Sequence, residues 1–220
     1  MKKKAFLIVA AILTVALAAA ALAACNGKGG GESTDVSRSV TALYVGESGA
    51  FAVSVETGMR EDPFLADGKA TEVKSFAEIT VTPLKSNSCK EVTYTLSCGE
   101  NTLNGTLAAN TFGEFRQDVP LDFAPDKIAV TADGATEEIE LQNVLDGKLT
   151  SSDVINIARK EFADRIAAES ADGAPSREIY VKLISGDRET YYYYVSFIGE
   201  GVDYWAMLVN PSTGEIVSKK

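Results

Sequence analysis

The sequence predicts a mostly β fold, an antiparallel β-sandwich followed by a small α+β domain. From Val40 to Leu145 apolar residues recur at every second position in short segments, which is the period of half-buried strands. From Val154 to Ile166 they recur at every fourth position, as on one side of an amphipathic helix. Three further strand-like segments follow, so this helix has a sheet on which to bury its apolar side.

Composition and charge exclude several classes of protein. Of the 220 residues, 45% are hydrophobic and 24% are charged, a balance typical of a folded chain. The chain contains no histidine, which excludes Ser-His-Asp and Cys-His catalytic groups and metal sites built on histidine. Its formal charge of −10 opposes binding to phosphate backbones. The acidic clusters at 137–140 and at Asp122 and Asp126 lack the spacing of a calcium loop. We therefore expect no catalytic residue, no cofactor, no metal and no nucleic-acid partner.

The amino terminus has the layout of a signal peptide. Three lysines, Lys2–Lys4, precede an apolar run from Ala5 to Ala24 in which Thr14 is the one polar residue. The run is also long enough to span a bilayer as a permanent helix, so its length alone leaves both interpretations open.

The end of this run favours a cleaved signal. Leu22-Ala23-Ala24-Cys25 resembles the lipobox of bacterial lipoproteins, in which the cysteine thiol is acylated and the peptide bond before it is cleaved. The resemblance implies that residues 1–24 are removed and that lipid on Cys25 anchors the protein to a membrane of the cell envelope, outside the cytoplasm. Removal of three lysines changes the formal charge to −13. The glycine-rich residues after Cys25 predict a flexible tether over 25–38.

Residues 39–146 are predicted to form an immunoglobulin-like β-sandwich. Short strands separated by turn clusters such as Gly46–Gly49 and Asp133-Gly134 are typical of this fold. The alternating sets that define the strands are Phe51/Val53/Val55, Ala77/Ile79/Val81, Val92/Tyr94/Leu96, Ile128/Val130 and Ile139/Leu141. The longest irregular stretch is Gly58–Lys69, and loops of about twelve residues are uncommon unless they are functional or packed on themselves. Phe64 and Leu65 in this loop either contact a partner or close the open end of the sandwich, and we favour closure.

Cys89 and Cys98 remain after acylation, and an exported pair of cysteines invites a disulfide. The segment between them, Lys90–Ser97, alternates as one strand without a turn residue. At about 3.3 Å per residue, one strand separates the cysteines far beyond the roughly 7 Å that a disulfide allows between Cα atoms. We therefore favour two free thiols over a bond.

Residues 147–220 are predicted to form the α+β domain. Thr150-Ser151-Ser152-Asp153 has the pattern of a capping box, which begins a helix, and Asp172–Pro175 has the pattern that ends one. The apolar stripe of this helix consists of Val154, Ala158, Phe162 and Ile166. Strands over 178–185, 190–198 and 202–209 would complete one helix on a three- to four-stranded antiparallel sheet.

This second region resembles a PepSY domain. The shared features are an Ile-Ala pair in the helix, here Ile157-Ala158, strands with a Tyr-x-Val core, and a final Thr-Gly-Glu-Ile turn, here Thr213–Ile216. Asn210-Pro211 stands where members of the family carry Asp-Ala. The resemblance implies an extracytoplasmic, noncatalytic module that restrains or assists secreted peptidases, with no catalytic residue to carry over.

The three strands of this region are predicted to have two different faces. Because side chains alternate across a strand, Ile179, Tyr193 and Tyr204 with their alternate neighbours are assigned to the helix side. The opposite face then carries the candidate partner-binding residues Tyr180, Tyr192, Tyr194, Trp205 and Met207. So aromatic a face is not expected to be left in water. It is either an interface between the two domains or a recognition surface for an extended polypeptide or a glycan.

Together these features predict a surface-anchored, noncatalytic lipoprotein of the bacterial envelope that binds a protein or peptide partner and modulates a secreted peptidase. One alternative is a glycan-binding or purely structural envelope lipoprotein. Another is an accessory lipoprotein of a transporter, although the substrate-binding kind normally needs two α/β lobes of repeated strand-helix units, a pattern that this sequence lacks.

Overall fold

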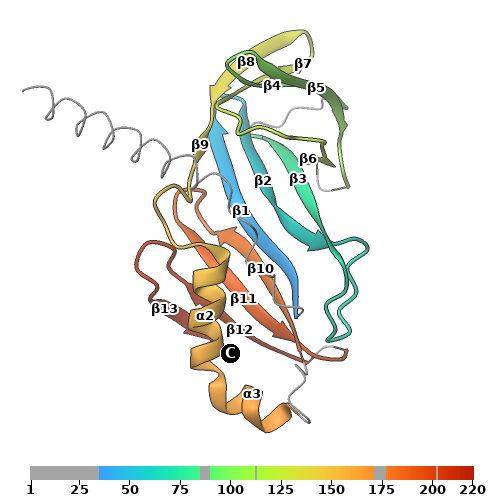
Figure 1. Cartoon of the computed structure of the whole chain (residues 1–220). Coiled ribbons are helices and arrows are strands. Elements are labelled where there is room, and N and C mark those ends of the chain that lie inside the picture. The colour runs from blue at the N-terminus through green and yellow to red at the C-terminus, as the bar shows by residue number, and fades with distance from the viewer. Residues whose placement is uncertain (1–34, 85–89, 112, 171–176, 202) are drawn as a thin grey trace, which may run out of the picture. The chain divides into compact units, whose positions relative to one another are not determined.

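Two β-sheets and two short helices make up the part of the chain that the computed structural model describes, residues 35–84, 90–111, 113–170, 177–201 and 203–220 (Figure 1). The predicted signal peptide and Cys25 lie outside these residues. The predicted tether over 25–38 is wrong at its carboxyl end, because Val36, Ser37 and Arg38 belong to the first strand, where pairing fixes the backbone. No helix within the described ranges is long and apolar enough to cross a membrane. The elements are β1 (Val36–Glu47), β2 (Phe51–Glu61), β3 (Val73–Pro83), β4 (Glu91–Cys98), β5 (Asn101–Ala108), β6 (Phe115–Asp118), β7 (Lys127–Ala132), β8 (Ala135–Glu140), β9 (Gln142–Asn143), α2 (Ser151–Glu161), α3 (Ala163–Glu169), β10 (Glu178–Ser185), β11 (Tyr191–Ile198), β12 (Tyr204–Val209) and β13 (Ile216–Lys219).

The larger sheet has the strand order β13-β12-β11-β10-β1-β2-β3-β6, and β9 also pairs with β1. The smaller sheet has the order β5-β4-β7-β8. Every neighbouring pair is antiparallel except β1 and β10, which run parallel. The prediction of a mostly β fold is therefore confirmed.

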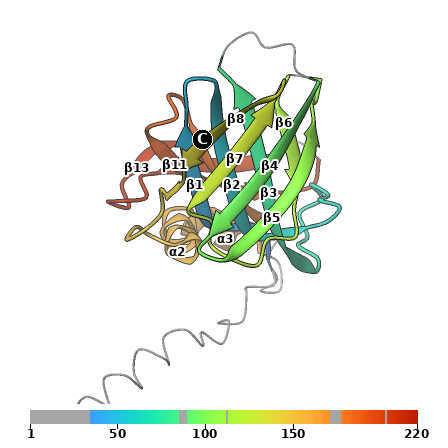
Figure 2. The ribbon, with the colours of Figure 1, turned by 90° about the horizontal axis from the view of Figure 1, so that it is seen from above.

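One apolar core lies between the two sheets. Phe51, Val53 and Val55 of β2 are buried in the same cluster as Val92 and Leu96 of β4. The smaller sheet lies over one end of β1, β2 and β3 (Figures 1 and 2). Each large apolar side chain removed from water in this way contributes about 1.5–3 kcal/mol to folding. The alternation along the sequence thus reflects burial of one side of each strand, as expected for a β-sandwich.

The turn between β7 and β8 has the local chemistry that its sequence predicted. Ala132 pairs with Ala135, so Asp133 and Gly134 form a two-residue hairpin loop. Both loop residues have positive φ, 50° and 82° respectively. A type I′ turn requires positive φ at both central positions, and Asp-Gly is one of the sequences that tolerate it best.

The predicted strand before Cys98 is also confirmed, because β4 runs without interruption from Glu91 to Cys98. Cys89 lies outside the described residues, so the absence of a Cys89–Cys98 bond stays a prediction.

The helix begins where its capping box predicted. The Thr150 side chain accepts a hydrogen bond from the Asp153 N–H (3.2 Å), and the Asp153 carboxylate accepts one from the Thr150 N–H (2.9 Å). The Thr150 hydroxyl also donates to the Asp153 carboxylate (2.7 Å), and this bond, followed by the one from the Thr150 N–H, holds the pKa of Asp153 below its usual value. The backbone leaves the helical region at Phe162, which separates α2 from α3. The residues of the predicted stripe, Val154, Ala158, Phe162 and Ile166, all pack into a second apolar cluster with β10–β12. The predicted helix end at Asp172–Pro175 lies outside the described residues.

The larger sheet runs without a break through both predicted domains. Val36 of β1 pairs with Ile179 of β10, and the Ser37 hydroxyl donates to the Ile179 carbonyl (3.4 Å). The buried Ser151 hydroxyl, at the start of α2, accepts from the Val40 N–H (2.9 Å) and donates to the Val40 carbonyl (2.5 Å). The sandwich and the helix-covered region therefore join through strand pairing at one edge, which leaves the helix-free face of β10–β12 uncovered by the smaller sheet.

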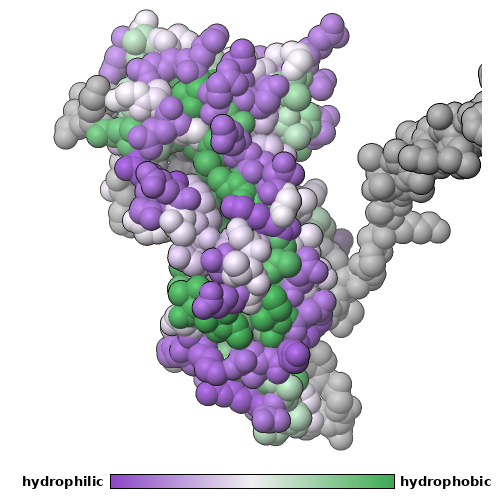
Figure 3. Space-filling model, turned by 90° about the vertical axis from the view of Figure 1, so that its left-hand side faces the viewer, coloured by the Kyte–Doolittle hydropathy of each residue, from purple (hydrophilic) through white to green (hydrophobic). Residues whose placement is uncertain are grey.

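The surface is mostly polar. In the space-filling view of Figure 3, hydrophilic side chains form most of both ends of the described molecule, and hydrophobic surface shows as separate patches between them. This is the surface expected for a chain with a strongly negative formal charge.

Candidate functional site

The pairing of β11 with β12 decides which aromatic residues remain accessible. Phe197 pairs with Trp205 and Val195 with Met207, so these four side chains share the face that α2 covers. Trp205 is 8% exposed and Met207 1%. Their predicted position on the helix-free face is therefore wrong.

The physical reason lies in the turn before β12. The Gly199 N–H donates to the Asp203 carbonyl (2.9 Å), and this turn brings Ile198 opposite Tyr204. A shift of one residue in the assumed phase of a strand moves every side chain to the other face. One signal in the sequence could have prevented the error. Trp205, Met207 and Val209 have more apolar surface to bury than the alternate residues of this strand, which favours their placement on the helix side.

Tyr180, Tyr192 and Tyr194 do lie on the helix-free face, as predicted, and Tyr204 joins them there. Tyr180 pairs with Ser196 and Tyr194 with Lys182, while Tyr204 pairs with Ile198. Tyr204 is 38% exposed. The sequence prediction placed Tyr204 on the helix side. The one-residue error in the alternation of β12 therefore also removed Tyr204 from the predicted site.

A pocket of about 320 Å³, the aromatic pocket, opens on this face. Its lining consists of Phe64, Ala66, Tyr180, Lys182, Tyr194, Ser196, Ile198, Gly201, Asp203 and Tyr204. Residues of β10 and β11 form its floor, and the 62–72 loop and the β11–β12 turn form its walls. Tyr192 shares the face but does not line the pocket. Of the predicted site residues, the structure thus brings together Tyr180 and Tyr194.

The irregular stretch predicted over Gly58–Lys69 begins later than predicted, because residues 58–61 pair with β3 as the end of β2, and the loop comprises residues 62–72. This loop contributes to the aromatic pocket rather than to the sandwich core. The Phe64 ring lies 5.0 Å from the Tyr180 ring, centroid to centroid. Phe64 is 40% exposed and Leu65 is 60% exposed, and neither belongs to the core between the sheets. The expectation that they close the open end of the sandwich is therefore wrong. Phe64 instead extends the aromatic surface of β10.

Two buried carboxylates hold the loop in place. Glu178 is fully buried and accepts a hydrogen bond from the Gly68 N–H (3.3 Å), while the buried Glu61 accepts one from the Thr71 N–H. Burial raises the pKa of Glu178, and the negative charge of Glu61 raises it further. The folded state therefore binds the Glu178 proton more tightly than the unfolded chain does, and the stability that this group contributes declines as pH rises through its raised pKa.

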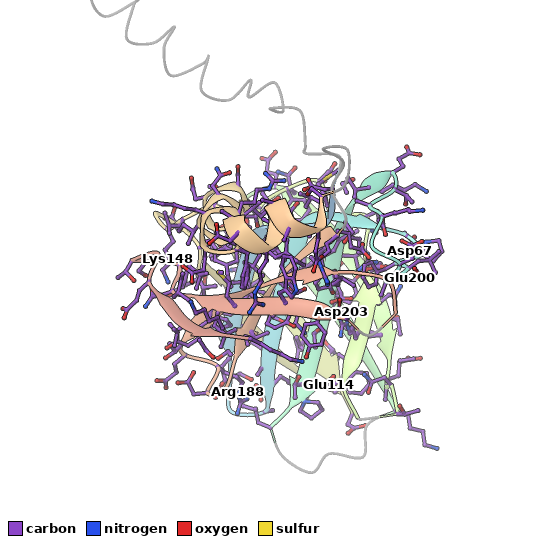
Figure 4. The ribbon with its side chains drawn as sticks, turned by 90° about the horizontal axis from the view of Figure 1, so that it is seen from below. Asp67, Glu114, Lys148, Arg188, Glu200 and Asp203 are labelled. Atoms are coloured by element: carbon purple, nitrogen blue, oxygen red, sulfur yellow. The ribbon has the colours of Figure 1, made fainter. Side chains whose placement is uncertain are left out.

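The loop also touches the β11–β12 turn. Asp67 and Glu200 lie at the same edge of the molecule in Figure 4, and a Cβ placed on Gly68 would lie 3.4 Å from the Glu200 nitrogen. Gly68 has a φ of 83°, and a Cβ placed on it would lie 3.3 Å from the Gly199 carbonyl carbon. Glycine is needed here for the left-handed backbone, which brings the loop against the turn. The two segments together close one end of the aromatic pocket.

Two further pockets adjoin the aromatic pocket, and we call the three together the groove. The second, of about 240 Å³, is lined by Ser37, Arg38, Arg60, Glu61, Asp62, Phe64 and Tyr180. The third, of about 390 Å³, is lined by Arg60, Asp62, Lys74, Ser75, Phe76, Ala77, Asp118, Val119, Pro120 and Leu121. The first two share Phe64 and Tyr180, and the last two share Arg60 and Asp62.

Arginine side chains brace the aromatic residues of the groove. The Arg38 guanidinium lies 4.5 Å from the Phe76 ring centroid and 5.5 Å from that of Tyr180, and it forms a salt bridge with Glu56 (2.6 Å). Arg60 lies 4.7 Å from the Phe76 ring and pairs with Asp118 and Glu78. Stacking of this kind contributes about 0.5–2 kcal/mol per contact. It restricts the orientations of the Phe76 and Tyr180 rings.

The groove is therefore suited to binding a ligand. Within the described ranges, no cluster of three or more Asp, Glu or Cys side chains is placed to hold a metal ion. Comparison with known proteins identified no matching family model, no similar curated protein and no similar solved structure.

Proposed function

We propose that this protein is a noncatalytic lipoprotein of the bacterial envelope that binds a protein or peptide partner in the groove. The observation that carries the proposal is the aromatic pocket, where Phe64, Tyr180, Tyr194 and Tyr204 from four separate segments line one cavity. Aromatic side chains at the centre of an interface supply much of its binding energy, and apolar pockets with a few polar groups are the usual ligand sites.

Two finer assignments of the fold belong to the same proposal. We assign residues 39–146 to an immunoglobulin-like sandwich and residues 147–220 to a PepSY-like region. The capped helix on the antiparallel strands β10–β13 supports the second assignment. The partner that the PepSY resemblance implies is a secreted peptidase, whose activity the protein would modulate.

The lipid anchor yields the first prediction. Cys25→Ser removes the thiol that acylation requires, so we expect the cleaved form of the variant to leave the detergent phase and stay in the aqueous phase in Triton X-114 partitioning. Uncleaved chain keeps the apolar run Ala5–Ala24, is distinguished by its larger mass and stays in the detergent phase. A single acyl chain gives only marginal membrane binding, and the loss should be nearly complete when all chains are absent. The matched control is Cys98→Ser, which should partition as the wild type does. A Cys25→Ser variant that is still cleaved and stays in the detergent phase would contradict the lipobox.

The groove yields the second prediction. Selection from a random peptide library against the full-length protein in detergent micelles should yield peptides whose affinity falls roughly thirtyfold in Tyr194→Ala and in Phe64→Ala, since loss of an aromatic anchor costs about 2 kcal/mol. The measurement is calorimetric titration with each selected peptide.

Leu65→Ala is the matched control for this experiment. Leu65 neighbours Phe64 on the same loop and is more exposed, but it lines none of the three pockets. Its affinity should equal that of the wild type. Selected peptides that bind Phe64→Ala and Tyr194→Ala as tightly as the wild type would rule out the groove as the binding site.

A further inference from the structure

We propose, resting on the function proposed above, that the groove recognises a polypeptide segment that carries an acidic group and a basic group on either side of an apolar side chain. Some charged side chains of the groove form salt bridges within the protein, and others do not. The side chains without a salt bridge determine which charges a ligand should carry.

The aromatic pocket contains a lysine ammonium that has no carboxylate partner among the described residues. Lys182 lies over the Tyr194 ring, its ammonium 5.3 Å from the ring centroid, and forms no ion pair with any described residue. The acidic residue of this pocket, Asp203, is paired with Arg177. A ligand in this pocket therefore meets the Lys182 ammonium with no competing carboxylate salt-bridged to it, and an anionic group is the complement.

The second pocket has the opposite charge. Its two arginines are neutralised within the protein, Arg38 by Glu56, and Arg60 by Asp118 and Glu78. The buried Glu61 carboxylate is occupied by the Thr71 N–H, but Asp62 is exposed and has no salt-bridge partner among the described residues. A cationic group is the complement here.

Phe64 and Tyr180 stand between these two charges, because they line both pockets. A ligand that spans the two pockets must pass this aromatic pair, which favours an apolar side chain at that point. The third pocket carries one unpaired charge of each sign, Asp62 and Lys74, neither of which has a salt bridge among the described residues.

This pattern favours a polypeptide over a glycan. A neutral glycan carries no charge for either pocket, and a uniformly anionic glycan complements the first pocket but is repelled by the second. A polypeptide carries both signs within a few residues of an apolar side chain. Its carboxylate comes either from Asp or Glu or from the free carboxyl terminus.

The test uses the full-length protein in detergent micelles and fluorescent heptapeptides with blocked ends. The probes are Gly-Glu-Gly-Phe-Gly-Lys-Gly, the reversed order Gly-Lys-Gly-Phe-Gly-Glu-Gly and the neutral Gly-Gln-Gly-Phe-Gly-Gln-Gly. One charged order should bind about tenfold more tightly than the neutral probe. A further probe replaces the acidic residue by a free carboxyl terminus. If the ligand's carboxylate is a chain terminus, this probe keeps the tenfold higher affinity over the neutral probe, and if it is an Asp or Glu side chain, the probe loses it.

Charge exchange makes the test specific. The double variant Lys182→Glu, Asp62→Lys should prefer the other charged order and leave affinity for the neutral probe unchanged. The control is Lys160→Glu, an exposed position on α2, which covers the opposite face of the sheet. It should behave as the wild type. Retention of the original preference by the double variant would overturn the inference.

The remaining outcomes separate the inference from the function beneath it. Equal binding of all three probes, lost in Phe64→Ala, overturns the charge pattern and leaves the groove as a peptide site. Binding of neutral chitohexaose that depends on Phe64 but not on Lys182 overturns the polypeptide assignment. Probes that bind Phe64→Ala as well as the wild type argue against the proposed function itself.

Discussion

Phe162→Ala is expected to lower the free energy of unfolding by about 3–5 kcal/mol, the sum of lost burial and the cavity left behind. Phe162 is 4% exposed at the junction of α2 and α3. Its ring centroid lies 5.5 Å from that of Phe197 and 5.6 Å from that of Trp205. The three rings pack against one another in the apolar cluster between α2 and the sheet, so truncation of one leaves the other two without a contact.

Urea unfolding of the full-length chain measures this loss. The control is Leu65→Ala, which truncates an apolar side chain that is 60% exposed and should change the free energy by less than about 0.5 kcal/mol. Because one sheet runs through both parts of the chain, both variants should unfold in a single transition. A loss for Phe162→Ala as small as that for Leu65→Ala would show that the stripe of α2 does not face a core.

Gly58→Ala is expected to destabilise the protein by about 3 kcal/mol through overpacking. Gly58 lies in β2 opposite Val40 of β1. A Cβ at this position would lie 2.1 Å from the Ser39 carbonyl oxygen and 3.0 Å from the Val40 Cα. The atoms in the way belong to the backbone, so no side-chain rotation relieves the collision. Glycine in a strand commonly marks such a close approach of two chains.

Gly49→Ala is the matched control, because a Cβ on Gly49 meets nothing within 4 Å and its φ is not positive. Thermal unfolding monitored by circular dichroism should show a Tm close to that of the wild type for Gly49→Ala and one lower by several degrees for Gly58→Ala. Equal Tm values for the two variants would mean that β1 and β2 separate at Gly58 at little cost.

Sequence alone was sufficient wherever the controlling interactions are local. The Thr150–Asp153 capping box, the Asp133-Gly134 turn and the stripe through Phe162 all formed as predicted. A cap and a two-residue turn are decided by a few consecutive residues, and a stripe is decided by the period of the helix. The same is true of the alternation that buried one side of β2 and β4.

Only the tertiary structure decided which aromatic residues form the candidate site. The face of Trp205 depends on the turn from Gly199 to Asp203, where a difference of one residue exchanges the two sides of β12. The role of Phe64 depends on contacts with Tyr180, which is far away in the sequence. The parallel pairing of β1 with β10, which brings Arg38 beside Tyr180, likewise leaves no periodic signal in either strand. Alternation along the sequence shows that a strand has two faces. Which elements pack on each face depends on segments that are distant in the sequence and meet only in the folded chain.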